Sequence, residues 1–447
     1  MSSPHRPKLF LMMVLQFFIW GAWLPLIFGY LPSLGFSAKS PPAALQEVIP
    51  EFLAKYFSEQ SLILNAFPFA AIVGMFFSNQ FADRNFSAER FLSFSHWVGG
   101  LAMFGLAYTR SFWPFFGLML VHCLFYVPTI SITNSIAFAH IADPQKEFGL
   151  IRMGGTLGWI LAAWPFTFIL VDWAQVNATE TSGFVSWLGT VLSSGLTGDA
   201  LKGATRWTFV VAGIASLVLA FFSMFLPHTP PRPAQSGETG SAWVKAFGLL
   251  AMPFVCVLWI VTLMDAFVHN AYFNWAGLFL GSSDVGIPGN WIMPVMSIGQ
   301  IAEIFTMFVL GMTLKNLGWK WTMILGVLGH AVRFAVWAYF PDNQWLIVMI
   351  QIMHGICYAF FFATVYIFVD EFLPKDIRAS AQGLFNLMIL GVGALVANSV
   401  CPYLFERWTV DGITDFRRLF MVPLSVAGMA IFLLLALFHP PKVATSS

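Results

Sequence analysis

The stretch LMMVLQFFIWGAWLPLIFGY, residues 11–30, contains twenty consecutive residues without a charged side chain. A helix that crosses the hydrocarbon core of a bilayer needs about 20 predominantly apolar residues. Arg6 and Lys8 precede the run as in a signal sequence, but the run is long and aromatic and has no A-x-A cleavage site. It therefore predicts a transmembrane helix that is retained in the protein.

Eleven further runs of this kind follow, in a chain of 447 residues that is 58% hydrophobic and 10% charged. Together the runs cover roughly 9–30, 60–81, 91–109, 113–140, 148–171, 206–226, 248–272, 291–313, 319–339, 344–369, 378–404 and 418–438. This pattern predicts an all-α integral membrane protein with twelve transmembrane helices in a lipid bilayer. The net charge of +1 gives no reason to expect a nucleic-acid partner.

A polar stretch divides the chain into two parts. LPHTPPRPAQSGETGSAWVK, residues 226–245, is rich in Pro, Gly and Ser and has no hydrophobic period. We expect six-helix bundles over 1–226 and 246–447, joined by a cytoplasmic linker over 227–245. Lys and Arg outside the runs are more numerous on the side of the two termini, which predicts that both termini are cytoplasmic.

Two short basic loops repeat between the halves. NQFADRNFSAER (79–90) follows the second run and GMTLKNLGWKW (311–321) follows the eighth, 232 residues apart when Asp83 is set against Lys315. The first loop resembles the loop motif of the major facilitator superfamily, with Asp83, Arg84 and Arg90 in place and the usual glycines replaced at Asn79 and Phe86. The resemblance implies the major facilitator fold.

Two insertions, 31–58 and 172–205, fall on the outer side in this topology. Each contains a short amphipathic pattern, PPAALQEVIPEFLAKYF in the first and GFVSWLGTVLSSGL in the second. Such patterns are typical of helices that lie on a membrane surface.

Polar side chains inside apolar runs are costly and therefore informative. Here they form stripes at helical spacing on four runs from both halves. The stripes are Arg152, Thr156 and Trp159; Asp265, His269, Asn270 and Asn274; Gln300 and Glu303; and His354 and Tyr358. These groups predict a central cavity that binds a polar solute containing a ring.

Eight stretches, in order along nearly the whole chain, resemble the nucleoside:proton symporter family of the major facilitator superfamily. They are QFFIWGAWLP (16–25), YVPTISITNSI (126–136), IRMGGTLGW (151–159), MSIGQIAEIF (296–305), RFAVWAY (333–339), HGICYAFFF (354–362), IRASAQGLF (377–385) and DGITDF (411–416). The resemblance implies proton-driven nucleoside import by alternating access, in a bacterial inner membrane.

The resemblance also implies roles for individual residues. Arg and Thr of the helix 5 motif contact the nucleoside above an aromatic ring, Gln and Glu of the helix 8 motif hold ribose or base and take part in proton coupling, and two helix 10 aromatics pack on the ligand. These roles fall on Arg152, Thr156 and Trp159, on Gln300 and Glu303, and on His354 and Tyr358, with Asn270 and Asn274 as candidate helix 7 amides.

The chain departs from the family pattern at two positions. Ala359 stands where an acidic residue commonly follows the second helix 10 aromatic, and the first aromatic is the titratable His354. We therefore expect Glu303 to be the main proton site. Asp265 is a second candidate, with His269 on its own helix face as a neutralising neighbour.

Two other polar side chains have blander expected roles. Arg333 is predicted to pair with a buried carbonyl or carboxylate, and His330 is expected to be isolated and structural, like His122.

Other classes of protein fit less well. An enzyme would need a catalytic pattern such as HExxH or GxSxG, and none is present. The four cysteines have no metal-ligand spacing, so neither a metal nor a cofactor is expected. A proton-coupled sugar or glycoside symporter and a non-transporting nutrient sensor remain the alternatives, and a monomer is expected.

Overall fold

The computed structural model describes residues 4–74, 86–141, 144–231, 247–373 and 378–441, and nearly all of them are helical. Of the two basic loops, Asp83 and Arg84 lie outside the described residues, as does most of the predicted linker. One small antiparallel sheet is described, in which β1 (Thr409–Val410) pairs with β2 (Ile413–Thr414).

The first half of the chain supplies the helices of one layer and two groups of short outer helices. The long elements are α1 (Arg6–Ser33), α4 (Glu59–Leu64) with α5 (Ala66–Val73), α7 (Ala88–Tyr108), α8 (Phe112–His140), α9 (Pro144–Ala163) with α10 (Phe166–Ile169), and α14 (Arg206–Ser223). The insertions form α2 (Ala43–Gln46) and α3 (Glu51–Ala54), and α11 (Trp173–Ala178), α12 (Phe184–Ser193) and α13 (Gly198–Ala204).

The second half forms the other layer, and two of its helices contain a π-helical turn. Its elements are η2 (Leu249–Ala251), α16 (Pro253–Leu280), α17 (Gly289–Tyr339), α18 (Gln344–Met349), α19 (Ile352–Cys357), the π-helix η3 (Tyr358–Ala363), α20 (Thr364–Phe372), α21 (Arg378–Asn386), the π-helix η4 (Leu387–Val392), α22 (Gly393–Arg407) and α23 (Phe416–Leu437). Such turns often mark functional positions.

Each of the twelve predicted runs coincides with helical segments. By length and composition, eight helices or joined helical segments of the described chain can cross a membrane, and one of them, α17, holds two predicted runs. The loop predicted inside α17 is reduced to a break at Gly318, whose φ of 73° suits glycine. The seventh run extends eight residues beyond its predicted end at residue 272, because α16 continues to Leu280.

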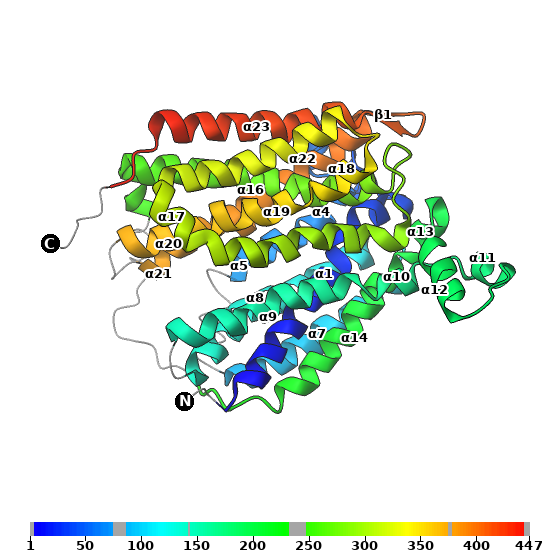
Figure 1. Ribbon diagram of the computed structural model, residues 1–447, viewed down its shortest axis with the longest axis horizontal. Coiled ribbons are helices and arrows are strands. Elements are labelled where there is room, and N and C mark those ends of the chain that lie inside the picture. The colour runs from blue at the N-terminus through cyan, green and yellow to red at the C-terminus, as the bar shows by residue number, and fades with distance from the viewer. Residues whose placement is uncertain (1–3, 75–85, 142–143, 232–246, 374–377, 442–447) are drawn as a thin grey trace.

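The two layers lie side by side in Figure 1, with the start of α1 and the end of α23 at the same end of the molecule. Within the layers, α1 packs on α9 and α17 packs on α19, while α1 meets α16 and α9 meets α17 across the boundary. Glycine permits the closest approaches: a methyl group at Gly158 of α9 would overlap the Val14 carbonyl oxygen of α1.

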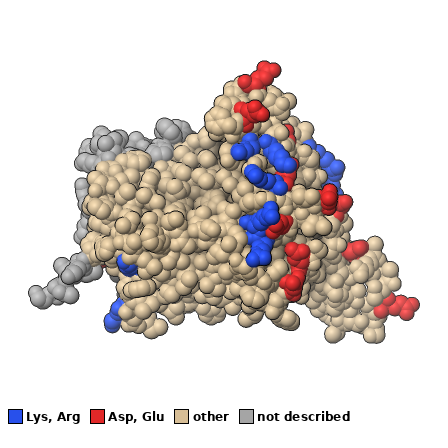
Figure 2. Space-filling view, turned by 90° about the horizontal axis from the view of Figure 1, so that it is seen from above, with Lys and Arg blue, Asp and Glu red and all other residues tan. Residues whose placement is uncertain are grey.

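The surface agrees with a membrane setting. Figure 2 shows a broad face with few charged groups, and most of the visible Lys, Arg, Asp and Glu gather towards the end that carries the outer helices. Large apolar side chains such as Phe94, Phe308 and Phe432 are exposed on the helices. Lipid is the solvent that such side chains match.

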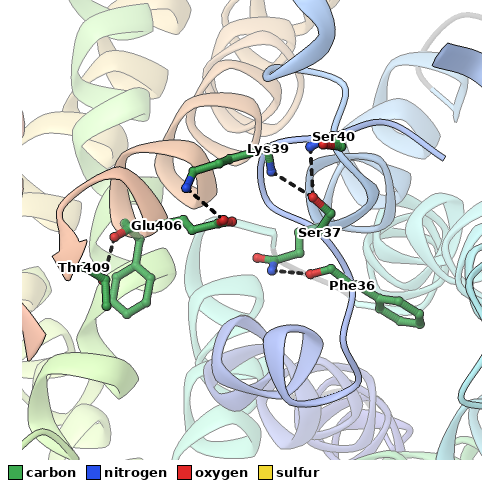
Figure 3. A network of polar contacts seen from close by, with 8 residues as sticks. Phe36, Ser37, Lys39, Ser40, Glu406 and Thr409 are labelled. Atoms are coloured by element: carbon green, nitrogen blue, oxygen red, sulfur yellow. Dashed lines mark hydrogen bonds and ion pairs between the residues drawn. The ribbon is translucent and has the colours of Figure 1, made fainter. Parts of the chain in front are cut away.

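The halves are joined at the end away from the helix termini of α1 and α23. Asn290 donates to the carbonyl oxygens of Thr167 and Leu192, at 3.3 Å each. In the first insertion, Lys39 forms a 3.0 Å ion pair with Glu406 of α22, beside the turn that Ser37 caps (Figure 3). The insertions therefore take part in closing this end.

Candidate functional site

The carboxylate of Glu303 lies at the boundary between the halves. It carries a side-chain hydrogen bond from Thr156 of α9 and interacts electrostatically with Arg152, one turn earlier on the same helix. Two polar stripes predicted from sequence, one from each half, are thus brought together. A carboxylate, a hydroxyl and a guanidinium converge there on half-buried side chains.

Arg152 is held in this apolar setting by an aromatic ring and a glycine. Its guanidinium carbon lies 4.2 Å from the centre of the Phe17 ring of α1, a cation–π contact. A methyl group at Gly155 would clash with both the Arg152 guanidinium and the Phe17 ring, so this glycine makes room for the pair. The close packing of α9 on α1 therefore sets the position of the cation.

Trp159 is part of an aromatic group that spans the halves. Its ring meets Trp20 edge-on at 5.3 Å and Phe273 of α16 at 6.0 Å. Trp20 in turn stacks on Phe67 of α5 at 4.7 Å with an angle of 16° between the rings, and its indole N–H has no hydrogen-bond partner. Flat rings with an unused donor suit a planar polar ligand.

Gln300 lies one turn before Glu303 on α17 and is 7% exposed. Its side-chain oxygen is buried without a hydrogen-bond partner. A buried amide in this state gains from a ligand that supplies a donor.

The two helix 10 aromatics are placed differently. Tyr358 opens η3, is half-buried and lies close enough to Glu303 for an electrostatic interaction. His354 is only 2% exposed, and its Cβ lies 2.8 Å from the position of a methyl group on Gly299. Its ring lies against those of His269, Tyr272 and Phe273 at 4.6–5.5 Å. Tyr358 therefore belongs to the Glu303 site, whereas His354 lies behind it.

The helix 7 amides are engaged within the protein. Asn270 donates to the Ala266 carbonyl oxygen at 2.8 Å. Asn274 donates to the side-chain oxygen of Asn398 at 3.0 Å, and Asn398 donates to the carbonyl oxygen of Leu64 in the other half. Asn274 thus ties the halves together and is not brought to Glu303.

Three expectations for the second half are wrong. The imidazole nearest Asp265 belongs to His330 of α17, at 3.7 Å, and not to His269 of its own helix. His330 is not isolated, because Arg333 lies 2.9 Å from its Nδ1 atom. Arg333 contacts two imidazoles at hydrogen-bond distance, including Nδ1 of His354 at 3.0 Å, and not the expected carbonyl or carboxylate. Side chains on different helices meet here, which spacing along one helix does not reveal.

Sequence reasoning missed three aromatic residues of the site, Phe17, Trp20 and Phe273. Phe17 and Trp20 are three residues apart, and Phe273 follows His269 by four, so each pair shares a helix face. In runs so rich in aromatic residues, this spacing alone does not single them out.

Comparisons with known proteins agree with this arrangement. A sequence model of the family described as "Nucleoside H+ symporter" matches residues 5–201 and 181–443. In Escherichia coli (strain K12), a provisionally named nucleoside transporter, YegT, is 29% identical over 424 residues, which cover 91% of this chain and 87% of the relative. Xanthosine permease of the same organism is 26% identical, covering 98% and 96%.

A solved structure supports the predicted fold class. The crystal structure of the nucleoside transporter NupG has a TM-score of 0.75 to this chain at 23% identity, covering 98% of this chain and 99% of that one. The likeness confirms an all-α membrane protein with the major facilitator fold.

Proposed function

The chain belongs to the nucleoside H+ symporter family, and from this premise we propose that the protein binds a nucleoside between its halves and carries it with protons. The observation that carries the proposal is the meeting of Thr156 and Arg152 with Glu303. A solute held there touches both halves, so rocking one half against the other exposes the site to each side in turn.

The substrate-binding residues in this proposal are those of the predicted stripes, with different weights. Arg152, Thr156, Gln300 and Glu303 supply the polar contacts, because their groups converge at the boundary. Trp159 and Tyr358 supply aromatic surface, and Trp20 adds a donor N–H. Asn270, Asn274 and His354 act from behind this layer.

Glu303 is the main exchangeable proton site in this mechanism, and Asp265 is the second. Glu303 has one polar neighbour from the opposite half and lies one turn from Gln300, so its environment changes when the halves separate. Since Ala359 offers no carboxylate, these two acids are the candidates inside the second half.

The direction of transport follows from the proposed topology. With both termini and the 227–245 linker in the cytoplasm, the contacts of Lys39 and Asn290 close the outer side and the site faces inward. In a bacterial inner membrane, an inward proton gradient then drives nucleoside import by a monomer built of the bundles 1–226 and 246–447.

The binding site is tested by Arg152→Ala and Gln300→Ala in purified protein. Each change removes a polar contact and should weaken nucleoside affinity about tenfold or more, the equivalent of about 1.4 kcal/mol. Gln344→Ala is the matched control, since Gln344 only donates to the Val285 carbonyl oxygen outside the site. Unchanged affinity in both site variants contradicts the assignment.

The substrate class is tested by competition between a nucleoside panel and a sugar panel. The aromatic group predicts that a planar base is required, so nucleosides should compete and hexoses should not. Preference for simple hexoses over every nucleoside would favour the sugar symporter. Uptake of labelled solute into vesicles, with and without a proton ionophore, separates a transporter from a sensor.

The coupling site is tested by Glu303→Gln, which keeps shape and hydrogen bonding but removes the titration. The variant should lose proton-driven accumulation while retaining binding and counterflow exchange, with a flattened pH dependence. Normal accumulation by Glu303→Gln, together with its loss in Asp265→Asn, would assign the coupling site to α16.

A further inference from the structure

A second cluster of ionisable side chains lies inside the second half, apart from Glu303. Arg333 of α17 is completely buried, as are Asp265 of α16 and His330 of α17. The guanidinium contacts Nδ1 of His354 at 3.0 Å through one nitrogen and Nδ1 of His330 at 2.9 Å through another. It also lies over the Tyr272 ring, 4.1 Å from its centre.

The chemistry of arginine fixes the state of both imidazoles. A guanidinium has only N–H donors, so each Nδ1 atom that it contacts must accept. His330 and His354 are therefore neutral, with their ring protons on Nε2. The Nε2–H of His330 then faces the Oδ2 atom of Asp265, 3.7 Å away.

Asp265 is the carboxylate that balances the charge of Arg333. Neither of its oxygens has a hydrogen-bond partner, and its electrostatic interaction is with Arg333. The ionisable groups around the pair are His269 and Tyr272 on α16, His330 on α17, and His354 and Cys357 on α19. Among the described residues, α1, α22, η4 and α23, which also pack on α16, add no acidic or basic neighbour to Asp265.

The cluster reaches the substrate site through His354. Gly299 lies directly before Gln300, and the Cβ and Cδ2 atoms of His354 press against it. The edge of the same imidazole meets Phe273 at 5.5 Å, and Phe273 contacts Trp159 of the other half. A shift of the His354 ring is therefore felt by Gln300 and by the aromatic group.

We propose that Asp265, His330, Arg333 and His354 form a single proton-accepting unit, in which Asp265 takes up the proton and Arg333 transmits the change to the substrate site through His354. The proton comes from water and converts the carboxylate into a carboxylic acid, without any redox change. Arg333 then loses its counter-charge, and its hold on the two imidazoles changes. The inference rests on the proposed function and adds a second proton site to it.

The unit is tested by the pH dependence of nucleoside affinity, measured without a pH gradient in purified protein. Glu303→Gln should retain part of this dependence, and the double variant Glu303→Gln/Asp265→Asn should lose it. We expect the affinity of Glu303→Gln to change about fivefold or more between low and high pH, and that of the double variant to change little. Identical pH profiles for the two proteins would overturn the proposal.

Arg333 and His330 are positioning residues in this scheme, and their variants have a matched control. Arg333→Lys and His330→Gln should each shift the pH profile of affinity, because neither preserves the bridge to both imidazoles. His96→Gln, a change at an equally buried histidine of the first half, should leave the profile unshifted. A shift of equal size in His96→Gln would contradict the assignment.

A substrate-free measurement separates this inference from the proposed function. The melting temperatures of wild type and Asp265→Asn are compared across the pH range, and their difference should vary with pH if Asp265 titrates. A constant difference overturns the unit even if nucleosides bind. A varying difference supports the unit even if another solute proves to be the substrate.

Discussion

A buried histidine network occupies each half of the protein, and the two networks differ in charge. In the first half, His96 contacts Ser216 at 3.0 Å and Gln16 at 2.9 Å, and Gln16 donates to Thr129 at 2.8 Å. These partners are all neutral. In the second half, the corresponding network contains a guanidinium and a carboxylate.

The networks occupy matching positions in the two halves. His96 and His330 are 234 residues apart (330 − 96), and His122 and His354 are 232 apart (354 − 122). His122 donates from Nδ1 to the Gly99 carbonyl oxygen at 3.1 Å, whereas His354 accepts at Nδ1 from Arg333. Gly99 and Arg333 are also 234 apart, so a change of partner at one position reverses the proton on the ring.

The difference assigns the halves different duties. A neutral network in which both ring nitrogens of His96 are engaged stabilises one arrangement of α1, α7, α8 and α14. The charged network leaves both oxygens of Asp265 without partners and so is able to exist in two protonation states. We infer that the first half is mainly scaffold and that the second half carries the responsive chemistry.

The largest expected effect on the comparison comes from Arg333→Met. Removal of the guanidinium leaves Asp265 as an uncompensated buried charge, which should lower the free energy of unfolding by about 3–5 kcal/mol. Denaturant unfolding in detergent measures the loss. Arg418→Met, at a largely exposed ion pair with Asp415, is the control and should cost less than about 1 kcal/mol. Equal losses in both variants would remove the distinction between the networks.

Gly158→Ala should have the next largest effect, because the added methyl group would overlap the Val14 carbonyl oxygen. We expect a loss of about 3 kcal/mol, typical of strong overpacking. Gly393→Ala, 235 residues further on (393 − 158), places a methyl group 2.5 Å from Cβ of Ala266 and should also destabilise. Gly117→Ala in α8 is the control, since nothing lies within 4 Å of the added atom. Stability losses as large in Gly117→Ala would show that packing is not the cause.

His96→Leu probes the neutral network alone. Gln16 and Ser216 would lose a buried partner, so the free energy of unfolding should fall by about 2 kcal/mol. The ratio of proton-driven accumulation to counterflow exchange should stay at the wild-type value, because no charge is removed. A changed ratio in vesicles would extend the responsive chemistry to the first half.

The smallest effect is expected from Lys39→Met, which breaks the ion pair that joins the halves at the outer end. Both partners are about half exposed, so the loss should be below about 1 kcal/mol and should vanish in high salt. Lys202→Met, at the exposed pair with Asp199 inside α13, is the matched control. A loss that is large and insensitive to salt would make this contact a principal closure of the halves.

Much of the architecture could be predicted from the sequence. The twelve runs fall on helices, and the helix 5 and helix 8 stripes meet as Arg152, Thr156 and Glu303. The pairing of Asp265 with His330 could not be predicted, and neither could the contact of Asn274 with Asn398. These residues lie on helices that are apolar on every face, so hydrophobic periodicity does not indicate which face meets which neighbour.

By itself, the sequence determined the number and approximate length of the membrane-spanning segments, because the thickness of the bilayer and the transfer energy of each side chain act locally. The tertiary structure decided which polar groups meet. That choice depends on the rotation and separation of packed helices, which glycines such as Gly158 and Gly355 set by admitting a neighbouring backbone. For this reason Arg333, which the sequence shows only as a cation in an apolar run, becomes the link between two histidines through the packing of α17 on α19.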